Sequence, residues 1–380
     1  MRLVPALVAC AALLPACKGC SDQELTPIED PAVQEPLGDI GRWLSMAVTA
    51  DGKPAVAYYD VDDNALGYAV GTIGADGKVV WTPEQVDSYP DANGLNPGDA
   101  GKYASLVIDG AGKPWIVYQD TTNGTLKYAT KDGDGWKVGI ADVGGGARSD
   151  AGYWASLALD PSGNPVAVHH DNGQGALRLA RWNGSGFTGE VVHDGEIVTN
   201  ADGTTTAGDA GAYAKLRYAA DGTAHVAFYD EALGALRLAR SSGAAWSVEV
   251  VDDTGDVGTW PDLLVDGSRV TIAYGDRTNG DLKLATGSPG AWTLETVDNG
   301  DTVGEDVALV PGGGGIVYMD GYNADMKLAR RSGDAWVLDV VTGADGARGF
   351  HNEAVNIGGT TYVGCYDFTA RTIWFSALPS

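Results

Sequence analysis

Residues 103 to 120 read Tyr103-Ala-Ser-Leu-Val-Ile-Asp-Gly-Ala-Gly-Lys-Pro-Trp-Ile-Val-Tyr-Gln-Asp120, and the chain continues with Thr-Thr-Asn-Gly-Thr-Leu126-Lys-Tyr-Ala. These residues form three short runs of β-branched, aromatic and other apolar residues. A fourth run, Trp136-Lys-Val-Gly-Ile-Ala-Asp142, follows after a turn. Short runs of this kind, bounded by Gly, Pro, Asp or Asn, are typical of antiparallel strands. The stretch therefore predicts four consecutive strands, called A to D from here on.

The same pattern occurs seven times, at intervals of 44 to 60 residues. In each copy strand B ends in an aspartate, and a Leu, Met or Ile follows six residues later. No helical periodicity appears after the leader. Repeated four-stranded units predict an all-β fold, a seven-bladed β-propeller of antiparallel blades. A six-bladed ring with one degenerate copy is the alternative. The repeat aspartates are Asp60, Asp120, Asp171, Asp230, Asp276, Asp320 and Asp367.

The two ends of the repeat array predict how the ring closes. The seventh copy stops after its strand C, at residues 372 to 378, and the first copy is preceded by the segment from Leu25 to Asp30. We expect this segment to complete the last blade, because pairing the termini removes exposed sheet edges. The predicted organisation is a signal peptide over 1–16, a lipidated N-terminus, tether and ring-closing strand over 17–38, and the propeller over 39–380.

The N-terminus predicts export from the cytoplasm. Arg2 precedes an apolar run, Leu3 to Leu14, that is too short to span a bilayer. The run ends in Leu14-Pro-Ala-Cys17, which resembles the lipobox of bacterial lipoproteins. The resemblance implies that Cys17 is acylated and anchors the protein outside the cytoplasm, in the outer membrane or at the cell surface. An ordinary secretory signal that happens to contain cysteines is the alternative.

Composition narrows the range of partners. The chain has 51 Asp and Glu against 25 Lys and Arg, a formal net charge of −26. Such an acidic surface argues against nucleic acid and against anionic lipids as partners. It suits solubility and cation binding. Cys365 is the one cysteine beyond the leader region, so a disulfide framework is not expected, and we interpret it as a small buried apolar residue.

A charge pattern predicts ion pairs across the C–D hairpins. A cation follows the repeat Leu or Met, and an acid lies three residues after the aromatic residue of strand D. Their midpoint is a Gly or Pro, which would place the two side chains opposite each other and contribute about 0.2–1 kcal/mol per pair. The predicted pairs are Arg178/Glu190, Arg237/Glu249, Lys283/Glu295 and Lys327/Asp339.

The loops between blades carry a second phrase, Asp-x-Gly-x-aromatic. In a propeller the D–A and B–C loops share one face around the central channel, so these residues are expected to gather at its mouth. Aromatic rings and carboxylates there could bind sugars, and carboxylates with loop carbonyls could hold Ca²⁺, the one cofactor considered. A purely structural role, with Asp capping turns and the aromatic packing between blades, is the alternative. The candidates are Asp39, Trp43, Asp99, Tyr103, Asp150, Trp154, Asp209, Tyr213, Asp256 and Trp260.

Departures from the repeat add further candidates. Blade seven carries Arg348 and His351 where the phrase breaks down, together with Asn352 and Glu353, and Arg148 lies on a loop of the same face. Adjacent strand residues point to opposite faces, so His169 and His170 cannot easily ligate one metal together. We interpret the pair as packed histidine in place of tyrosine. Catalysis would have to use these few residues, because no known catalytic motif is present.

The repeat from Ser105 to Ala129 resembles repeats of secreted and surface bacterial proteins, similar in kind to sialidase-like and lectin-like propellers. The resemblance implies the architecture and transfers no catalytic residue, since the Asp-box of sialidases is missing. Two functions follow as hypotheses. The first is a membrane-anchored propeller that binds a glycan or a surface protein. The alternative is a glycan-cleaving hydrolase or lyase that uses Arg42, Arg148 and His351.

Overall fold

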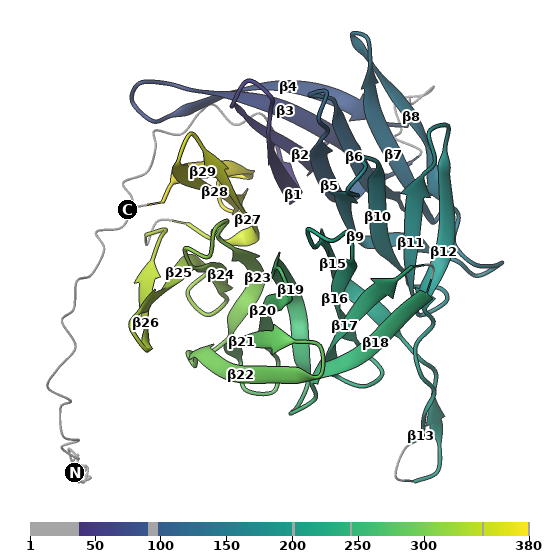
Figure 1. The fold of residues 1–380 in the computed structure, drawn as a ribbon. Coiled ribbons are helices and arrows are strands. Elements are labelled where there is room, and N and C mark those ends of the chain that lie inside the picture. Colours follow the sequence, from purple (N-terminus) through teal and green to yellow (C-terminus); the bar gives the residue numbers. More distant parts are fainter. Residues whose placement is uncertain (1–37, 90–97, 200–201, 244, 344–345, 379–380) are drawn as a thin grey trace, which may run out of the picture.

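The computed structural model describes residues 38–89, 98–199, 202–243, 245–343 and 346–378. Seven antiparallel sheets stand around a central axis like the blades of a fan (Figure 1). All the longer regular elements of these ranges are strands. The predicted all-β, seven-bladed propeller is therefore confirmed, and the six-bladed alternative is wrong. The predicted signal peptide, Cys17 and the tether lie outside the described residues.

The first four blades follow the predicted order A to D. Their strands are β1 (Ile40–Val48), β2 (Pro54–Asp60), β3 (Ala65–Ile73), β4 (Val79–Asp87); β5 (Ala100–Ile108), β6 (Pro114–Asp120), β7 (Thr125–Asp132), β8 (Gly135–Asp142); β9 (Ala151–Leu159), β10 (Pro165–Asp171), β11 (Ala176–Trp182), β12 (Phe187–His193); and β15 (Ala210–Tyr218), β16 (Ala224–Asp230), β17 (Ala235–Ser242), β18 (Ala245–Asp252).

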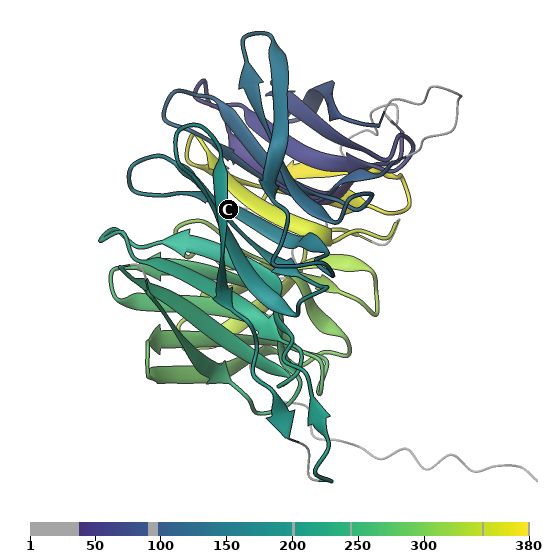
Figure 2. The same ribbon diagram turned by 90° about the vertical axis from the view of Figure 1, so that its right-hand side faces the viewer.

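The last three blades continue in the same way. Their strands are β19 (Val257–Asp266), β20 (Arg269–Asp276), β21 (Asp281–Ser288), β22 (Ala291–Asp298); β23 (Val303–Leu309), β24 (Ile316–Asp320), β25 (Asp325–Ser332), β26 (Ala335–Val340); and β27 (Phe350–Ile357), β28 (Thr360–Asp367), β29 (Thr372–Ala377). A small hairpin of β13 (Val198–Thr199) and β14 (Thr205–Thr206) projects from the connection between blades three and four (Figure 2).

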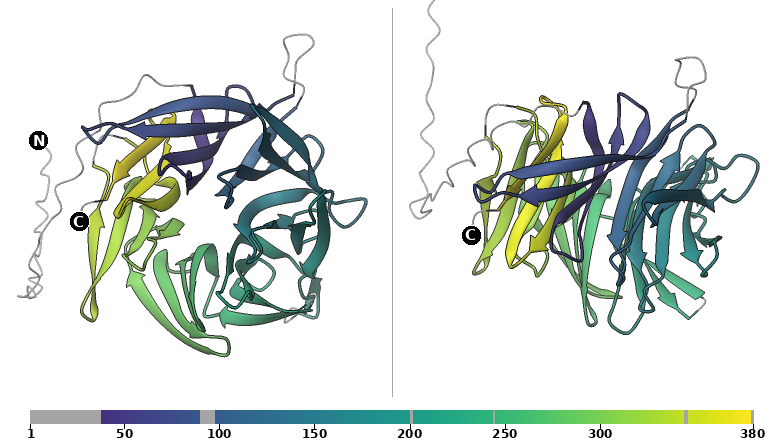
Figure 3. Two further views of the ribbon diagram at one scale, coloured as in Figure 1. Left: turned by 45° about the horizontal axis from the view of Figure 1, so that its top comes forward. Right: turned by 90° about the horizontal axis from the view of Figure 1, so that it is seen from above.

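Position within a blade explains strand composition. Strand A lies nearest the axis and strand D at the outside (Figure 3). Strand B is covered on both faces by neighbouring blades, and all seven residues of β6 are buried. It therefore reads as a continuous apolar run. Strand D alternates between exposed and half-buried residues, as in β18. Proline opens β2, β6 and β10, where a strand tolerates the missing N–H.

The hydrophobic core lies between blades. Seven clusters of buried side chains are present, one at each junction of two blades. Val168 and Leu179 of blade three, for example, pack with Leu216 and Phe228 of blade four. The cluster that contains Ile40 of blade one also contains residues of blade seven. The ring is therefore closed by side-chain packing within the described residues.

Hydrogen bonds of the backbone and of side chains reinforce the junction between blades seven and one. Ile40 N donates to Arg371 O at 3.1 Å, and the Tyr366 hydroxyl donates to Asp39 Oδ1 at 2.6 Å. Blade seven has three strands in the part of the chain that the structure describes. The predicted ring-closing segment, Leu25 to Asp30, lies outside that part, so its pairing with β29 stays a prediction.

We expect a protein that starts at residue 39 to melt at a lower temperature than one that starts at residue 18, because the outer edge of blade seven would lose its partner strand. Thermal unfolding followed by circular dichroism measures the difference. Equal melting temperatures would show that the segment before residue 39 does not complete the blade.

Buried ion clusters join neighbouring blades. Asp252, at the end of β18 in blade four, accepts hydrogen bonds from Tyr274 Oη at 2.6 Å and from Lys283 Nζ at 2.5 Å, both in blade five. Burial opposes ionisation of Asp252, but the bonds from Lys283 and Tyr274 outweigh it and lower its pKa. The cluster recurs as Asp87 with Tyr118 and Lys127, Asp142 with His169 and Arg178, and Asp298 with Tyr318 and Lys327.

The predicted cross-hairpin ion pairs are wrong. Arg178 lies opposite Val191, and Glu190 lies opposite Leu179. The other three hairpins show the same offset of one residue. The turns pivot between two residues rather than on one, so the register differs by one position and the cation points to the other face of the sheet. There Arg178, Lys283 and Lys327 meet the buried carboxylate of the preceding blade. Arg237 instead pairs with Asp230 of its own blade and with Glu196.

Asp252→Ala should lower the free energy of unfolding by about 3–5 kcal/mol, because it leaves Lys283 charged and buried without its partner. The neighbouring exposed Asp253 offers a matched control, and Asp253→Ala should change stability by less than about 0.5 kcal/mol. Urea unfolding measures both. A small loss in Asp252→Ala would mean that the inter-blade cluster is not a source of stability.

Candidate functional site

Seven residues, one from the start of each strand A, surround the axis. We call this set the channel ring. Each member has a left-handed backbone, with φ between 45° and 55°. Five of the aromatic residues and the histidine predicted from the sequence are among them, so the structure brings these six together. The seventh, Asp306, was not predicted. The channel ring consists of Trp43, Tyr103, Trp154, Tyr213, Trp260, Asp306 and His351.

The same backbone geometry recurs in each blade and produces the channel ring from the phrase Gly-x-aromatic. The glycine two residues earlier also has a positive φ, for example 114° at Gly211. A Cβ atom on Gly211 would lie 2.8 Å from the Leu177 Cα of the preceding blade, so no larger residue fits. The register of each A–B pair shifts at this point, as it does between Ala212 and Lys215. This β-bulge turns the next side chain, Tyr213, toward the axis.

The aromatic members contact one another in sequence. Centroid distances are 5.1 Å for Trp43–Tyr103, 5.5 Å for Tyr103–Trp154, 4.8 Å for Trp154–Tyr213 and 4.7 Å for Tyr213–Trp260. Burial raises the pKa of Tyr213 to about 12, so this phenol stays protonated at neutral pH. Five successive rings thus form one continuous arc around five blades.

The ring planes run along the channel. Successive planes differ by 52°, 54°, 47° and 44°. Neighbouring blades of a seven-fold ring differ by a rotation of about 51° around the axis. When equivalent aromatic rings are related by this rotation, the angle between their planes reaches the full rotation only if the planes are parallel to the axis. The aromatic side chains therefore line the opening and do not cover it.

The arc is interrupted at blades six and seven. Asp306 and His351 occupy the two remaining places, and His351 Nδ1 lies 3.5 Å from Asp306 Oδ1. His351 also contacts the end of the arc, with its centroid 5.7 Å from that of Trp43. Asn352 Nδ2 donates to the Asp306 carbonyl oxygen at 2.9 Å and so ties the two blades together. This break gives the channel a polar side.

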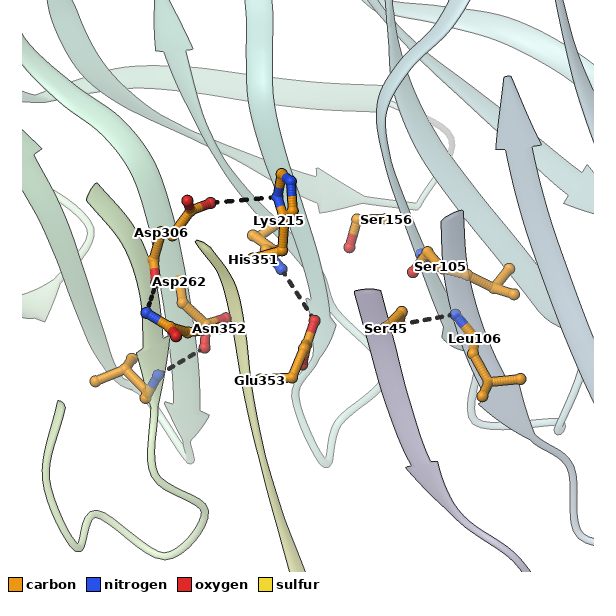
Figure 4. A network of polar contacts seen from close by, with 12 residues as sticks. Ser45, Ser105, Leu106, Ser156, Lys215, Asp262, Asp306, His351, Asn352 and Glu353 are labelled. Carbon is orange, nitrogen blue, oxygen red and sulfur yellow. Dashed lines mark hydrogen bonds and ion pairs between the residues drawn. The ribbon is translucent and has the colours of Figure 1, made fainter. Parts of the chain in front are cut away.

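A second tier lies two positions further along each strand A, where six blades have a polar residue and blade six has Ala308. Ser45, Ser105 and Ser156 accept hydrogen bonds from backbone N–H groups of the following blade at 2.9–3.1 Å. In blades four and seven the same position holds Lys215 and Glu353 instead, and Lys215 Nζ lies 3.7 Å from Glu353 Oε1 (Figure 4).

The second tier contains one cation, Lys215, and two carboxylates, those of Glu353 and Asp262. Burial raises the pKa of Glu353, and Lys215 partly offsets that rise. In blade five the position holds Asp262, which accepts from Leu309 N at 2.9 Å and from Arg217 Nη2 at 3.0 Å. Glu353 was predicted from the sequence, whereas Lys215, Asp262 and Asp306 were not. Their signal was the loss of the Ser or the aromatic residue at a fixed distance from the glycine of the phrase.

The two tiers enclose a cavity of about 130 Å³ that opens at the channel mouth. An apolar cavity of about 150 Å³ can hold a benzene molecule. The space therefore suits a single six-membered ring or a group of that size. The five aromatic side chains of the channel ring line part of it, and Asp306, His351, Lys215 and Glu353 supply polar groups.

The predicted aspartates of the phrase do not face the cavity. They take part in contacts at the blade junctions: Asp209 Oδ1 accepts from His170 Nε2 at 2.8 Å, and Asp256 Oδ1 accepts from Tyr229 Oη at 2.6 Å. Asp39 accepts from Tyr366 in the same way, and Asp150 accepts from Tyr153 Oη at 2.9 Å. Asp99 accepts from Lys102. Their contacts are those of a scaffold.

The repeat aspartates cap the B–C turns. Asp276 Oδ1 accepts from the backbone N–H groups of Thr278 and Asn279 at 3.0 and 3.1 Å. Equivalent bonds occur at Asp60, Asp120, Asp230, Asp320 and Asp367. This is the structural role that the sequence offered as the alternative to ligand binding.

The arginines do not form a cluster. Arg348 is buried, and its Nε donates to Asp367 Oδ2 at 2.6 Å. Arg42 lies 3.5 Å from Asp39 and over the ring of Tyr366, while Arg148 is exposed on its loop. None of the three is among the cavity-lining residues of the described chain. Of the residues named for a hydrolase or lyase, His351 therefore lines the cavity, whereas Arg42 and Arg148 do not.

The described ranges contain no group of three or more His, Cys, Asp or Glu side chains arranged to hold a metal ion. These ranges also contain no helix of the length and apolarity needed to cross a membrane. Cys365 is buried and free, and burial raises its pKa to about 12.

Comparison with known proteins supports the fold. No family model and no curated protein matches the sequence. Among solved structures, polysaccharide lyase Uly1 has a TM-score of 0.52 at 11% identity over 95% of this chain and 93% of that one. Pseudomonas aeruginosa periplasmic gluconolactonase PpgL has a TM-score of 0.50 at 14% identity over 88% of each chain. SapL1 lectin in complex with alpha methyl fucoside has a TM-score of 0.45 at 13% identity, covering 80% and 97%. The chain is a propeller of this general kind, and identities this low establish the fold alone.

The left-handed backbone of the channel ring predicts an unusual mutational order. Trp154 has a φ of 46°, so Trp154→Gly should be more stable than Trp154→Ala by about 1 kcal/mol. At the next residue, where φ is ordinary, Ala155→Gly should instead lose about 0.5–1 kcal/mol. Chemical denaturation measures all three proteins. A Trp154→Ala variant more stable than Trp154→Gly would contradict the bulge geometry.

Proposed function

We propose that the protein is a carbohydrate-binding propeller that is tethered outside the cytoplasm through an acyl group on Cys17. The observation that carries the proposal is the arc of five aromatic side chains around an open cavity. An arc with polar groups on one side suits a sugar, whose ring has apolar C–H faces and a rim of hydroxyl groups. Ligand pockets usually combine apolar walls with a few placed polar groups.

The polar groups match the hydrogen-bonding needs of one sugar unit. Asp306 and Glu353 can accept from hydroxyls, Lys215 can donate, and the hydroxyls of Ser45 and Ser105 add further polar groups to the lining. The cavity of about 130 Å³ admits one such unit. A larger portion of a glycan would have to remain outside the channel mouth.

Charge favours neutral or basic sugars. The one cationic side chain lining the cavity in the described residues is Lys215, and it is already paired with Glu353. Asp306 adds a carboxylate, and the whole chain carries a net charge of −26. An acidic sugar would be repelled by the Asp306 carboxylate and by the net negative charge of the protein. This electrostatic pattern disfavours sialic acids and uronates as ligands.

The alternative is cleavage of a glycan at the same cavity. Its supporting observation is the contact of His351 with Asp306 beside the aromatic arc, since a histidine next to a carboxylate can act as an acid or base. The missing arginine cluster weakens it for acidic substrates. Binding without turnover is therefore the function that the geometry supports best.

A glycan array with residues 18–380 tests the proposal, followed by calorimetry on the sugars that bind. Neutral and amino sugars should bind, and acidic ones should bind more weakly. Trp260→Ala should weaken binding by about tenfold or more, since aromatic anchors dominate such sites. Trp292→Ala, a tryptophan on the outer strand β22, should leave affinity within about twofold.

Three results would speak against this reading. A folded protein that binds no sugar would overturn the proposal. Binding that survives Trp260→Ala would place the sugar site outside the channel. Release of new reducing ends from a bound glycan, abolished in His351→Ala, would favour the hydrolase or lyase.

A further inference from the structure

The residues that break the channel ring lie on the same two blades as two exposed aromatic side chains. Tyr322 is 77% exposed on the B–C loop of blade six, and Phe368 is 54% exposed on that of blade seven. At these two positions after the repeat aspartate, the other five blades have no aromatic residue. Tyr322 and Phe368 are the two aromatic residues among the large apolar side chains that are exposed in the described ranges.

The two loops open on the face of the channel mouth. The start of strand A pairs with the end of strand B in both blades, as Val303 does with Asp320 and Phe350 with Tyr366. Residues 321–322 and 368 follow those strand ends directly. The exposed aromatics therefore lie on the same face of the ring as the channel mouth, on the two blades that carry Asp306 and His351.

Two neighbouring residues of β27 in blade seven make ring contacts, one inside the channel and one at the surface. His351 contacts Trp43 inside the channel, with centroids 5.7 Å apart. The preceding residue, Phe350, contacts Phe368 at the surface, with centroids 5.8 Å apart. Phe368 also lies edge-on to Tyr366 at 6.2 Å. Packing against these two rings holds the Phe368 side chain in place while more than half of it stays exposed.

We infer that the ligand is an oligosaccharide, with one terminal unit in the channel and the following units over blades six and seven. This inference rests on the proposed function. The cavity holds one unit, so a longer ligand must leave through the channel mouth. Asp306 and His351 interrupt the arc, so the side of the channel mouth toward blades six and seven is polar, and Phe368 and Tyr322 give the next units aromatic surfaces there. A single face of a sugar stacks on one exposed ring without burying a large apolar area.

Calorimetry with a monosaccharide and with tri- and tetrasaccharides of the same sugar tests the inference on the protein comprising residues 18–380. The wild type should bind the longer ligands about tenfold more tightly than the monosaccharide. Phe368→Ser and Tyr322→Ser should each reduce affinity for the longer ligands about three- to tenfold and leave that for the monosaccharide unchanged. Leu233→Ser, an exposed apolar residue on the B–C loop of blade four, is the matched control and should change neither.

The outcomes distinguish failure of the oligosaccharide inference from failure of the proposed sugar-binding function. Equal affinity for short and long ligands, or full chain-length dependence in both Ser variants, would overturn the inference and leave single-unit binding intact. Absence of any sugar binding to the wild type would overturn the proposed function and the inference with it. In that case, protection of Tyr322 and Phe368 by a bound protein would assign this surface to a protein partner instead.

Discussion

Every blade of this molecule buries its two faces only by packing against its neighbours. A sheet of four short strands has no core of its own, and each of the seven hydrophobic clusters is shared by two blades. The ring must therefore close, and the strands nearest the axis must approach one another. The glycine of each Gly-x-aromatic phrase permits that approach, as the contact of Gly211 with Leu177 shows. The bulge that follows then turns one side chain per blade into the channel. The candidate site is a consequence of closing the ring.

The same constraint explains much of the acidic composition. Carboxylates at the ends of strands B and D are used inside the scaffold, where they cap turns or pair with a tyrosine and a cation across a blade junction. Such a group is costly to bury alone and well placed when its partners come from the next blade. The junction between blades three and four uses a different solution, with His193 next to Phe228, and Arg237 turned to Asp230 and Glu196. A recurring acid therefore indicates a junction, and the acids that matter for a ligand are those outside the repeat.

Repeat pattern alone was sufficient to predict the fold, because short strands bounded by turn residues recur seven times at intervals of 44 to 60 residues. It also predicted which aromatic residues meet, since equivalent positions in a ring are neighbours in space. The hairpin register was mispredicted because Arg178 and Glu190 can be placed opposite each other by a turn one residue different from the actual one. Lys215 and Asp306 were missed for another reason. Each is an ordinary polar residue in the sequence, and only the alignment of seven strands A around one axis shows that it replaces a serine or an aromatic ring.

A ring with seven equal members could hold a ligand but could not orient it, because each of seven rotations would present the same contacts. Orientation requires that some blades differ. Here the differences are grouped: Lys215 and Asp262 in blades four and five, Asp306 in blade six, and His351 and Glu353 in blade seven. In the proposed function, the aromatic arc would supply affinity along one side of the channel and the polar groups would supply direction along the other. Since the exposed aromatics of blades six and seven stand outside the same polar side, the asymmetry inside the channel and that on the surface favour one path for a ligand.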